Sequence, residues 1–181
     1  NDNNLSFTDK ANDWGVADPS FTQGAAYADL DNDGDMDLVT NNINDPVFLY
    51  ENRATQINGN NYLKLKLIGD QGANLLSYGA KAWIYYGDKM QLLEVSPNRG
   101  YLSTNDPVLH FGLGKTNTID RLEIEWLDGR QLKMEGVKVN QMLTLKQADA
   151  KQGAIQAEAA KPTLFKDITL TTGINYLHQE N

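Results

Sequence analysis

The stretch Asp29-Leu30-Asp31-Asn32-Asp33-Gly34-Asp35-Met36-Asp37 carries a carboxylate at every second position. Like charges held this close repel one another strongly in a partly desolvated loop. Residues 11–52 contain nine acidic residues and no Lys or Arg, so the sequence places no counter-charge nearby. We therefore expect a cation from solution. Calcium fits best, because it is a hard divalent ion with a large, flexible shell of oxygen ligands.

The spacing also indicates which residues would bind this ion. Four aspartates are expected to offer side-chain oxygens: Asp29, Asp31, Asp33 and Asp37. Asp35 follows the turn directly and is expected to offer its backbone carbonyl. Gly34 permits the sharp reversal of the chain that a side chain would hinder.

Two other interpretations of the acidic loop are weaker. An EF-hand loop needs a bidentate Glu at about its twelfth position and a helix on each side. Counted from Asp29, that position is Thr40, and the flanking residues 25–28 and 38–39 have the length of strands. A merely solvated acidic turn would not need aspartates at alternate positions. The loop is therefore predicted to be a calcium site in a β-hairpin.

The composition limits the classes of function. The chain of 181 residues is 40% hydrophobic, which supports a packed core, and its net charge of −8 without a basic stripe argues against nucleic-acid binding. The lack of cysteine excludes disulfides and thiolate metal sites, and two histidines argue against catalytic zinc. Without an apolar run of about 18 residues, no membrane insertion is expected in this segment. Because the chain opens with Asn1, we interpret it as a piece of a larger protein.

The acidic loop lies within a small β unit at residues 1–55. Its expected strands are 24–28, 36–40 and 47–51. Three strands alone bury too little apolar surface to be stable, so this unit is expected to pack on something larger.

Residues 60–147 are predicted to form a β-domain of their own. Leu and Lys alternate from Leu63 to Leu67, which is typical of a strand with one buried and one wet face. Tight turns are expected at Gly87-Asp88 and Asp128-Gly129, and a last strand at 137–145. The predicted fold class is all-β, with a compact antiparallel β-sandwich or a partly closed barrel.

The C-terminal part differs in composition. Residues 148–161 are rich in alanine and are interpreted as a linker that ends at Pro162. Beyond it, a short pattern returns at a constant offset of 158 residues. Phe165-Lys166-Asp167 with Gly173-Ile174 repeats Phe7-Thr8-Asp9 with Gly15-Val16. A second copy of the opening unit is therefore predicted to begin near residue 162.

Two segments resemble known families. Residues 28–39 match D-x-D-x-D-G-x-x-D and resemble the FG-GAP (VCBS) repeat of integrin-type β-propellers, in which this loop binds calcium at the edge of a blade. Residues 60–147 resemble the ASPIC/UnbV domain that follows such propellers. The residues that carry this second resemblance are Tyr78–Lys81, Gly100–Ser103, Leu109–Gly114 and Arg121–Arg130.

These resemblances imply a multi-domain secreted or surface protein. Residues 1–55 would be a fragment of a propeller blade, and residues 162–181 the start of a further FG-GAP-type module. No defined activity is implied.

Other candidate residues are few. His110 lies in a strand pattern with no Ser or Cys partner motif and is expected to be a packed or edge-strand histidine. Glu123 and Glu125 are interpreted as the solvated face of a strand. The segment 98–106 concentrates side chains that hold sugars or peptides. Its candidate ligand-binding residues are Arg99, Tyr101 and Asn105, although the favoured interpretation of Arg99 and Tyr101 is that they buttress the domain by packing.

We therefore expect a non-enzymatic, calcium-stabilised module for binding or adhesion, located extracellularly, at the cell surface or in the periplasm. The alternative is a glycan-binding accessory domain of a carbohydrate-active enzyme. A protein or glycan on a surface is the expected partner. Exposed strand edges could also pair with a second copy.

Overall fold

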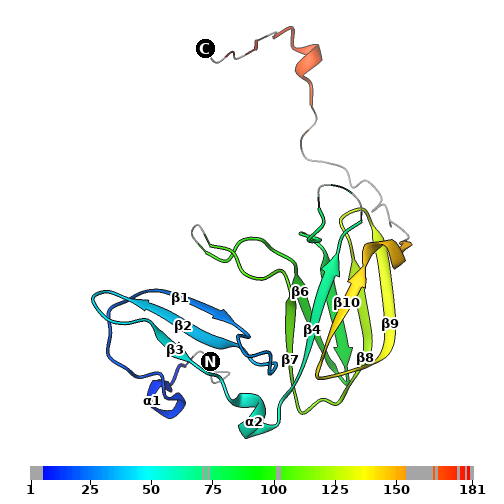
Figure 1. Cartoon of the computed structure of the whole chain (residues 1–181). Helices are drawn as coiled ribbons and strands as arrows, with labels where there is room; N and C mark the ends of the chain where they lie inside the picture. Colours follow the sequence, from blue (N-terminus) through cyan, green and yellow to red (C-terminus); the bar gives the residue numbers. More distant parts are fainter. Residues whose placement is uncertain are drawn as a thin grey trace.

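The structure is a computed structural model that describes residues 6–70, 72, 74–100, 103–153, 165, 167–174, 176, 177 and 179. Figure 1 shows a small sheet beside a larger two-layered body. The helices and strands, in chain order, are α1 (Ala11–Trp14), β1 (Thr22–Ala28), β2 (Asp37–Asn42), β3 (Phe48–Tyr50), α2 (Ala54–Asn58), β4 (Asn61–Ile68), β5 (Lys81–Tyr86), β6 (Lys89–Glu94), β7 (Leu109–Gly114), β8 (Thr118–Glu125), β9 (Arg130–Lys138), β10 (Gln141–Lys146), η1 (Gln147–Asp149), β11 (Lys151–Gln152) and η2 (Thr169–Thr171).

The small sheet contains β1, β2 and β3 in that order, with both pairs antiparallel. The acidic loop joins β1 to β2, so it lies in a β-hairpin as predicted, and the flanking helices of an EF-hand are not there. The sheet itself is thinly covered. Six of the seven residues of β1 are exposed, which leaves its cohesion to backbone pairing and to the contacts of its loop.

The larger body is a β-sandwich. One sheet has the order β10-β4-β7 and the other β11-β9-β8-β5-β6. Alternate residues of both sheets face inward and form one core, because successive side chains of a strand point to opposite faces. Its largest fully buried apolar side chains are Phe111, Leu63, Leu65, Ile84, Ile119, Leu122, Ile124 and Val95. The two sheets share no strand in the described residues, so the prediction of a sandwich is confirmed and the alternative of a partly closed barrel is wrong.

Three details differ from the sequence-based expectation. β10 runs parallel to β4, whereas all other strand pairs of the described chain are antiparallel. The expected last strand at 137–145 is wrong as one element, because the chain turns at Asn140 (φ 57°) between β9 and β10. The expected linker at 148–161 starts too early, since β11 pairs with β9 and extends the sandwich to residue 152. Residues 154–161 lie outside the described residues.

The opening segment and its predicted copy share local geometry where both are described. Asp9 Oδ1 accepts the backbone N–H of Ala11 at 2.8 Å, just before α1. Asp167 Oδ1 accepts that of Thr169 at 2.9 Å, just before η2. Each helical turn is followed by a left-handed glycine, with φ of 73° at Gly15 and 69° at Gly173. The equivalent positions, 158 residues apart, therefore form the same short motif.

None of the helices in the described part of the chain has the length and apolar character needed to cross a bilayer.

Candidate metal centre

Three of the five loop aspartates converge. The side chains of Asp29, Asp31 and Asp33 each place an oxygen within 4.8 Å of the others. The loop curls because its own carboxylates accept its backbone N–H groups: Asp31 Oδ1 from Asp33 at 3.1 Å, Asp33 Oδ1 from Asp35 at 3.0 Å, and Asp29 Oδ2 from Gly34 at 3.1 Å. Such side chain to backbone bonds are typical of aspartate in tight turns.

Gly34 is required at its position for two reasons. Its φ of 98° lies in the region that favours glycine. A Cβ atom there would also overlap the ring of Tyr62, which β4 presents against the loop. The prediction that the chain reverses at this glycine is consistent with both observations.

Two buried carboxylate oxygens of the loop have no hydrogen-bond partner among the described residues: Asp29 Oδ1 and Asp35 Oδ1. The side chain of Asp29 is only 3% exposed, and Asp35 is 7% exposed. Burying an anionic oxygen without a partner costs several kcal/mol, on the order of the values for other buried charges. The donor set of the loop therefore fits a bound cation, and hard oxygen ligands suit calcium.

Asp35 and Asp37 lie outside the converging group; Asp35 bonds to α2, and Asp37 bonds to the loop and to the residue at position 52. Asp35 Oδ2 accepts the backbone N–H of Thr55 at 2.6 Å, in the first turn of that helix. The two oxygens of Asp37 accept the backbone N–H groups of Leu30 at 2.9 Å and Asn52 at 2.8 Å. The loop thus uses these two carboxylates to fix its own ends and the following helix. Their predicted roles as metal ligands stay predictions.

The expectation that the loop has no counter-charge from the chain is wrong. Lys64 of β4 forms an ion pair with Oδ2 of Asp29, and its side chain is only 10% exposed. Lys64 does lie on the face of β4 opposite the core, as its alternation with leucine predicts. That face is covered by the acidic loop at Lys64 and wet at Lys66.

Further contacts dock the loop and α2 on the sandwich. The carbonyl of Gly34 accepts a hydrogen bond from Nε2 of His110 at 2.8 Å, which fixes the proton on that nitrogen. The His110 ring lies nearly parallel to that of Tyr62, with ring centroids 6.0 Å apart. Gln56 of α2 donates to Asp33, and Lys115 donates to the carbonyl of Asn58 at the end of α2. The prediction of a packed histidine agrees with these contacts.

Sequence reasoning missed the residues outside the loop that build this site, above all Lys64 and Tyr62. Both are 28 or more residues from Gly34 and lie in an ordinary amphipathic strand. A usable signal is the absence of any base in residues 11–52, because any counter-charge that the chain supplies must then come from another segment.

The other predicted candidates, in the segment 98–106, stay predictions. Arg99 is exposed and Asn105 is half-buried, and the backbone N–H of Arg99 donates to Ser103 at 3.1 Å. Tyr101 lies outside the described residues. Glu123 pairs with Arg121 at 3.4 Å and Lys133 at 2.9 Å on the outer face of the larger sheet, so it belongs to a network of surface charges.

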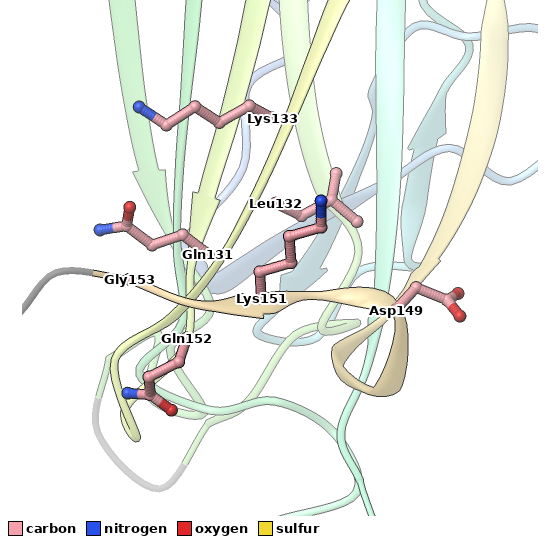
Figure 2. Close-up of a pocket in the computed structure, with 7 residues that line it drawn as sticks. All are labelled: Gln131, Leu132, Lys133, Asp149, Lys151, Gln152 and Gly153. Carbon is pink, nitrogen blue, oxygen red and sulfur yellow. The ribbon is translucent and has the colours of Figure 1, made fainter.

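A surface hollow of about 370 Å³ lies between β9 and the segment that carries η1 and β11. The side chains that line it are drawn in Figure 2: Gln131, Leu132, Lys133, Asp149, Lys151, Gln152 and, as backbone, Gly153. Their polar ends point in different directions, so they do not converge on a common ligand position. The acidic loop is therefore the stronger candidate site.

The fold and the loop together define a β protein of two parts. One part is a sandwich, and the other is a small sheet whose acidic loop brings three aspartates together. Residues 70–152 match the protein family described as ASPIC and UnbV. This match supports the resemblance of the sandwich to the ASPIC/UnbV domain. The FG-GAP resemblance of residues 28–39 stays a prediction.

The chain is also similar to cartilage acidic protein 1 from two vertebrates. It is 32% identical to the Xenopus tropicalis protein over 111 residues, and 31% identical to the Homo sapiens protein over 113 residues. These alignments cover 59% and 60% of the chain but 16% of each relative. The chain therefore spans about one sixth of the length of these curated relatives.

Proposed function

We propose that this chain is a non-enzymatic, calcium-binding module of a larger extracellular protein and serves in binding or adhesion. The observation that carries the calcium part is the buried Asp29 Oδ1, which has no hydrogen-bond partner in the described part of the chain. It belongs to a side chain that converges with Asp31 and Asp33. The ion would neutralise these carboxylates and fix the hairpin on the sandwich, so metal binding and folding would be coupled.

The extracellular setting is supported by similarity. The relatives are named for cartilage and for acidity, and this chain carries a net charge of −8. The ASPIC and UnbV match covers the sandwich from β5 to β11. A non-enzymatic role is supported by the contacts of two residues that could act as catalytic acids or bases. His110 hydrogen-bonds to the carbonyl of Gly34, and Glu123 forms an ion pair with Lys133 at the surface.

The calcium part is tested by thermal unfolding and by titration calorimetry on the purified chain. An ion present at about 100 times its dissociation constant stabilises the folded state by roughly 2.7 kcal/mol, so calcium should raise Tm by several degrees and excess chelator should reverse this. Magnesium should substitute poorly because it requires small, near-octahedral geometry.

The double substitution Asp31→Asn with Asp33→Asn should abolish the response to calcium. The matched control is Asp45→Asn, which removes an exposed acidic side chain outside the loop and should leave the response intact. A wild-type chain whose Tm and calorimetric trace ignore millimolar calcium would refute the calcium part of the proposal.

The partner is proposed to be a protein or a glycan. A glycan array separates the main proposal from the carbohydrate-enzyme alternative, since selective sugar binding favours the accessory domain.

Pairing between copies is proposed through β1, an almost fully exposed strand at one edge of the small sheet. Sedimentation velocity over a range of concentrations measures that association.

A further inference from the structure

Lys64 is a part of the site that the calcium proposal leaves without a role. It reaches the loop from β4 of the sandwich, and its Nζ pairs with Oδ2 of Asp29. The same Oδ2 accepts the backbone N–H of Gly34 at 3.1 Å. Oδ1 of that carboxylate is buried and has no hydrogen-bond partner among the residues described. One carboxylate therefore holds an internal cation through one oxygen and keeps the other available for a second cation.

The negative charges around the Asp29 carboxylate outnumber the positive ones. The three converging aspartates carry three formal negative charges, and the ammonium of Lys64 offsets one of them. Asp35 and Asp37 add negative charge close by, and they too accept backbone N–H groups, as the converging aspartates do. Lys64 is the basic side chain that the described structure pairs with the converging group.

We propose that Lys64 is a specificity-determining residue of the loop: a built-in cation that sets which ionic charge the site prefers. This inference rests on the proposed calcium function. Its basis is Coulomb's law, because the repulsion between the ammonium and a bound ion grows with the charge of the ion. Lys64 therefore disfavours a trivalent ion more than a divalent ion that uses the same oxygen ligands. Since Lys64 belongs to the sandwich, the sandwich contributes to the selectivity of a loop in the other sheet.

The test compares the dissociation constants of Ca²⁺ and Tb³⁺, a trivalent ion that also prefers oxygen ligands, by titration calorimetry on the full 181-residue chain. The variant is Lys64→Met, which keeps an unbranched apolar stem and removes the charge. It should raise the preference for Tb³⁺ over Ca²⁺ by about fivefold to tenfold, as expected for one unit charge at short range in a partly buried site. The ratio of affinities is the readout, because a general loosening of the loop would weaken both ions together.

Two control variants separate charge from docking. Lys66→Met removes a charge from the same face of β4 at an exposed position, and Tyr62→Ala removes the ring that packs against Gly34 without changing the charge. Both should leave the ratio of affinities within about twofold of wild type. If Lys64→Met does not fold, Lys64→Gln keeps a hydrogen-bond donor and tests the same loss of charge.

The outcomes separate the two proposals. If the wild type binds neither ion, the calcium function fails and this inference fails with it. If the wild type binds calcium but Lys64→Met leaves the ratio unchanged, the inference alone is overturned. An equal rise of the ratio in Tyr62→Ala would overturn it as well, because docking rather than charge would then set the selectivity.

Discussion

At Gly34, both the backbone conformation and the packing exclude a Cβ atom. The positive φ of 98° disfavours any residue with a Cβ, and the ring of Tyr62 occupies the space that a Cβ would need. The carbonyl of the same residue accepts the hydrogen bond from His110. A single glycine therefore determines the bend of the loop and how closely the loop approaches the sandwich.

We predict that Gly34→Ala destabilises the chain by about 2 kcal/mol or more, from backbone strain together with overpacking against Tyr62. Urea unfolding followed by circular dichroism measures this change. The control is Gly24→Ala in β1, where a Cβ meets no atom within 4 Å, and it should shift stability far less. Equal stability of Gly34→Ala and wild type would contradict the packing described at this residue.

Among the elements, α2 depends on polar groups that lie outside it. Asn52 Oδ1 accepts the backbone N–H of Ala54 at 3.0 Å, and its amide donates to the carbonyl of Met36 at 3.1 Å. Asp35 accepts the next N–H of the helix, from Thr55. A helix of five residues is too short to be stable alone, so these bonds to its first turn position it.

Asn52→Ala should lower the free energy of unfolding by about 1–2 kcal/mol, the usual cost of losing two part-buried hydrogen bonds. It should also weaken calcium binding, because the loop loses one of its links to the start of α2. Asn41→Ala, at the exposed position of β2, serves as the comparison and should be nearly neutral. Chemical denaturation and calorimetry give the two quantities, and an unaffected unfolding curve for Asn52→Ala would argue against this anchoring role.

The turn between β8 and β9 provides a prediction about pH. Desolvation acts to raise the pKa of Asp128, but hydrogen bonds from the backbone and guanidinium of Arg130 outweigh it and lower that pKa below its ordinary value. A carboxyl group whose pKa is lowered in the folded state stabilises that state above its unfolded pKa, and this contribution is lost as the pH falls through the folded pKa. The turn should therefore be weakened only in acid.

We expect Asp128→Asn to lower Tm at about pH 7, and this effect to disappear as the pH falls through the lowered pKa of Asp128 and its carboxyl group becomes protonated. Thermal unfolding across this range provides the measurement. The control is Asp88→Asn, which removes an acidic side chain from the exposed turn between β5 and β6 and so makes the same change in net charge. A Tm difference for Asp128→Asn that stays constant through that fall in pH would rule out the role of its ionised form.

Alternation predicted most strands but not every turn or contact. Residues 137, 139, 143 and 145 are apolar and share one parity, so the alternation runs through the turn at Asn140 and conceals it. The parallel pairing of β10 with β4 depends on the path of the chain around the sandwich, which no local pattern records. Alternation likewise placed Lys64 on the outer face of β4 but could not indicate that the loop covers it. The converging aspartates were predictable because their spacing is local.

At the scale of the whole molecule, the acidic loop connects the small sheet to the sandwich through direct side-chain contacts. Its contacts to β4 and β7 are made by Lys64, Tyr62 and His110. The small sheet itself buries little apolar surface, so we expect its order to depend on these contacts. The sandwich has its own hydrophobic core, so we expect its stability not to depend on the loop.

Removal of calcium should therefore loosen one part of the molecule and not the other. Hydrogen exchange read by mass spectrometry should speed up on chelation in residues 29–37 and 52–58 and stay unchanged in β5 and β8. The Asp31→Asn, Asp33→Asn double variant should show the faster exchange with or without chelator. Uniform acceleration through the sandwich core would mean that the two parts unfold as one unit.

The central claim is that the converging carboxylates of the loop bind calcium, and a crystal structure determined in millimolar calcium tests it most directly. The account predicts an anomalous density peak within about 2.3–2.6 Å of oxygens of Asp29, Asp31 and Asp33, with Lys64 still paired to the other oxygen of Asp29. A well-ordered loop without such a peak, in which Lys64 alone neutralises these carboxylates, would contradict it.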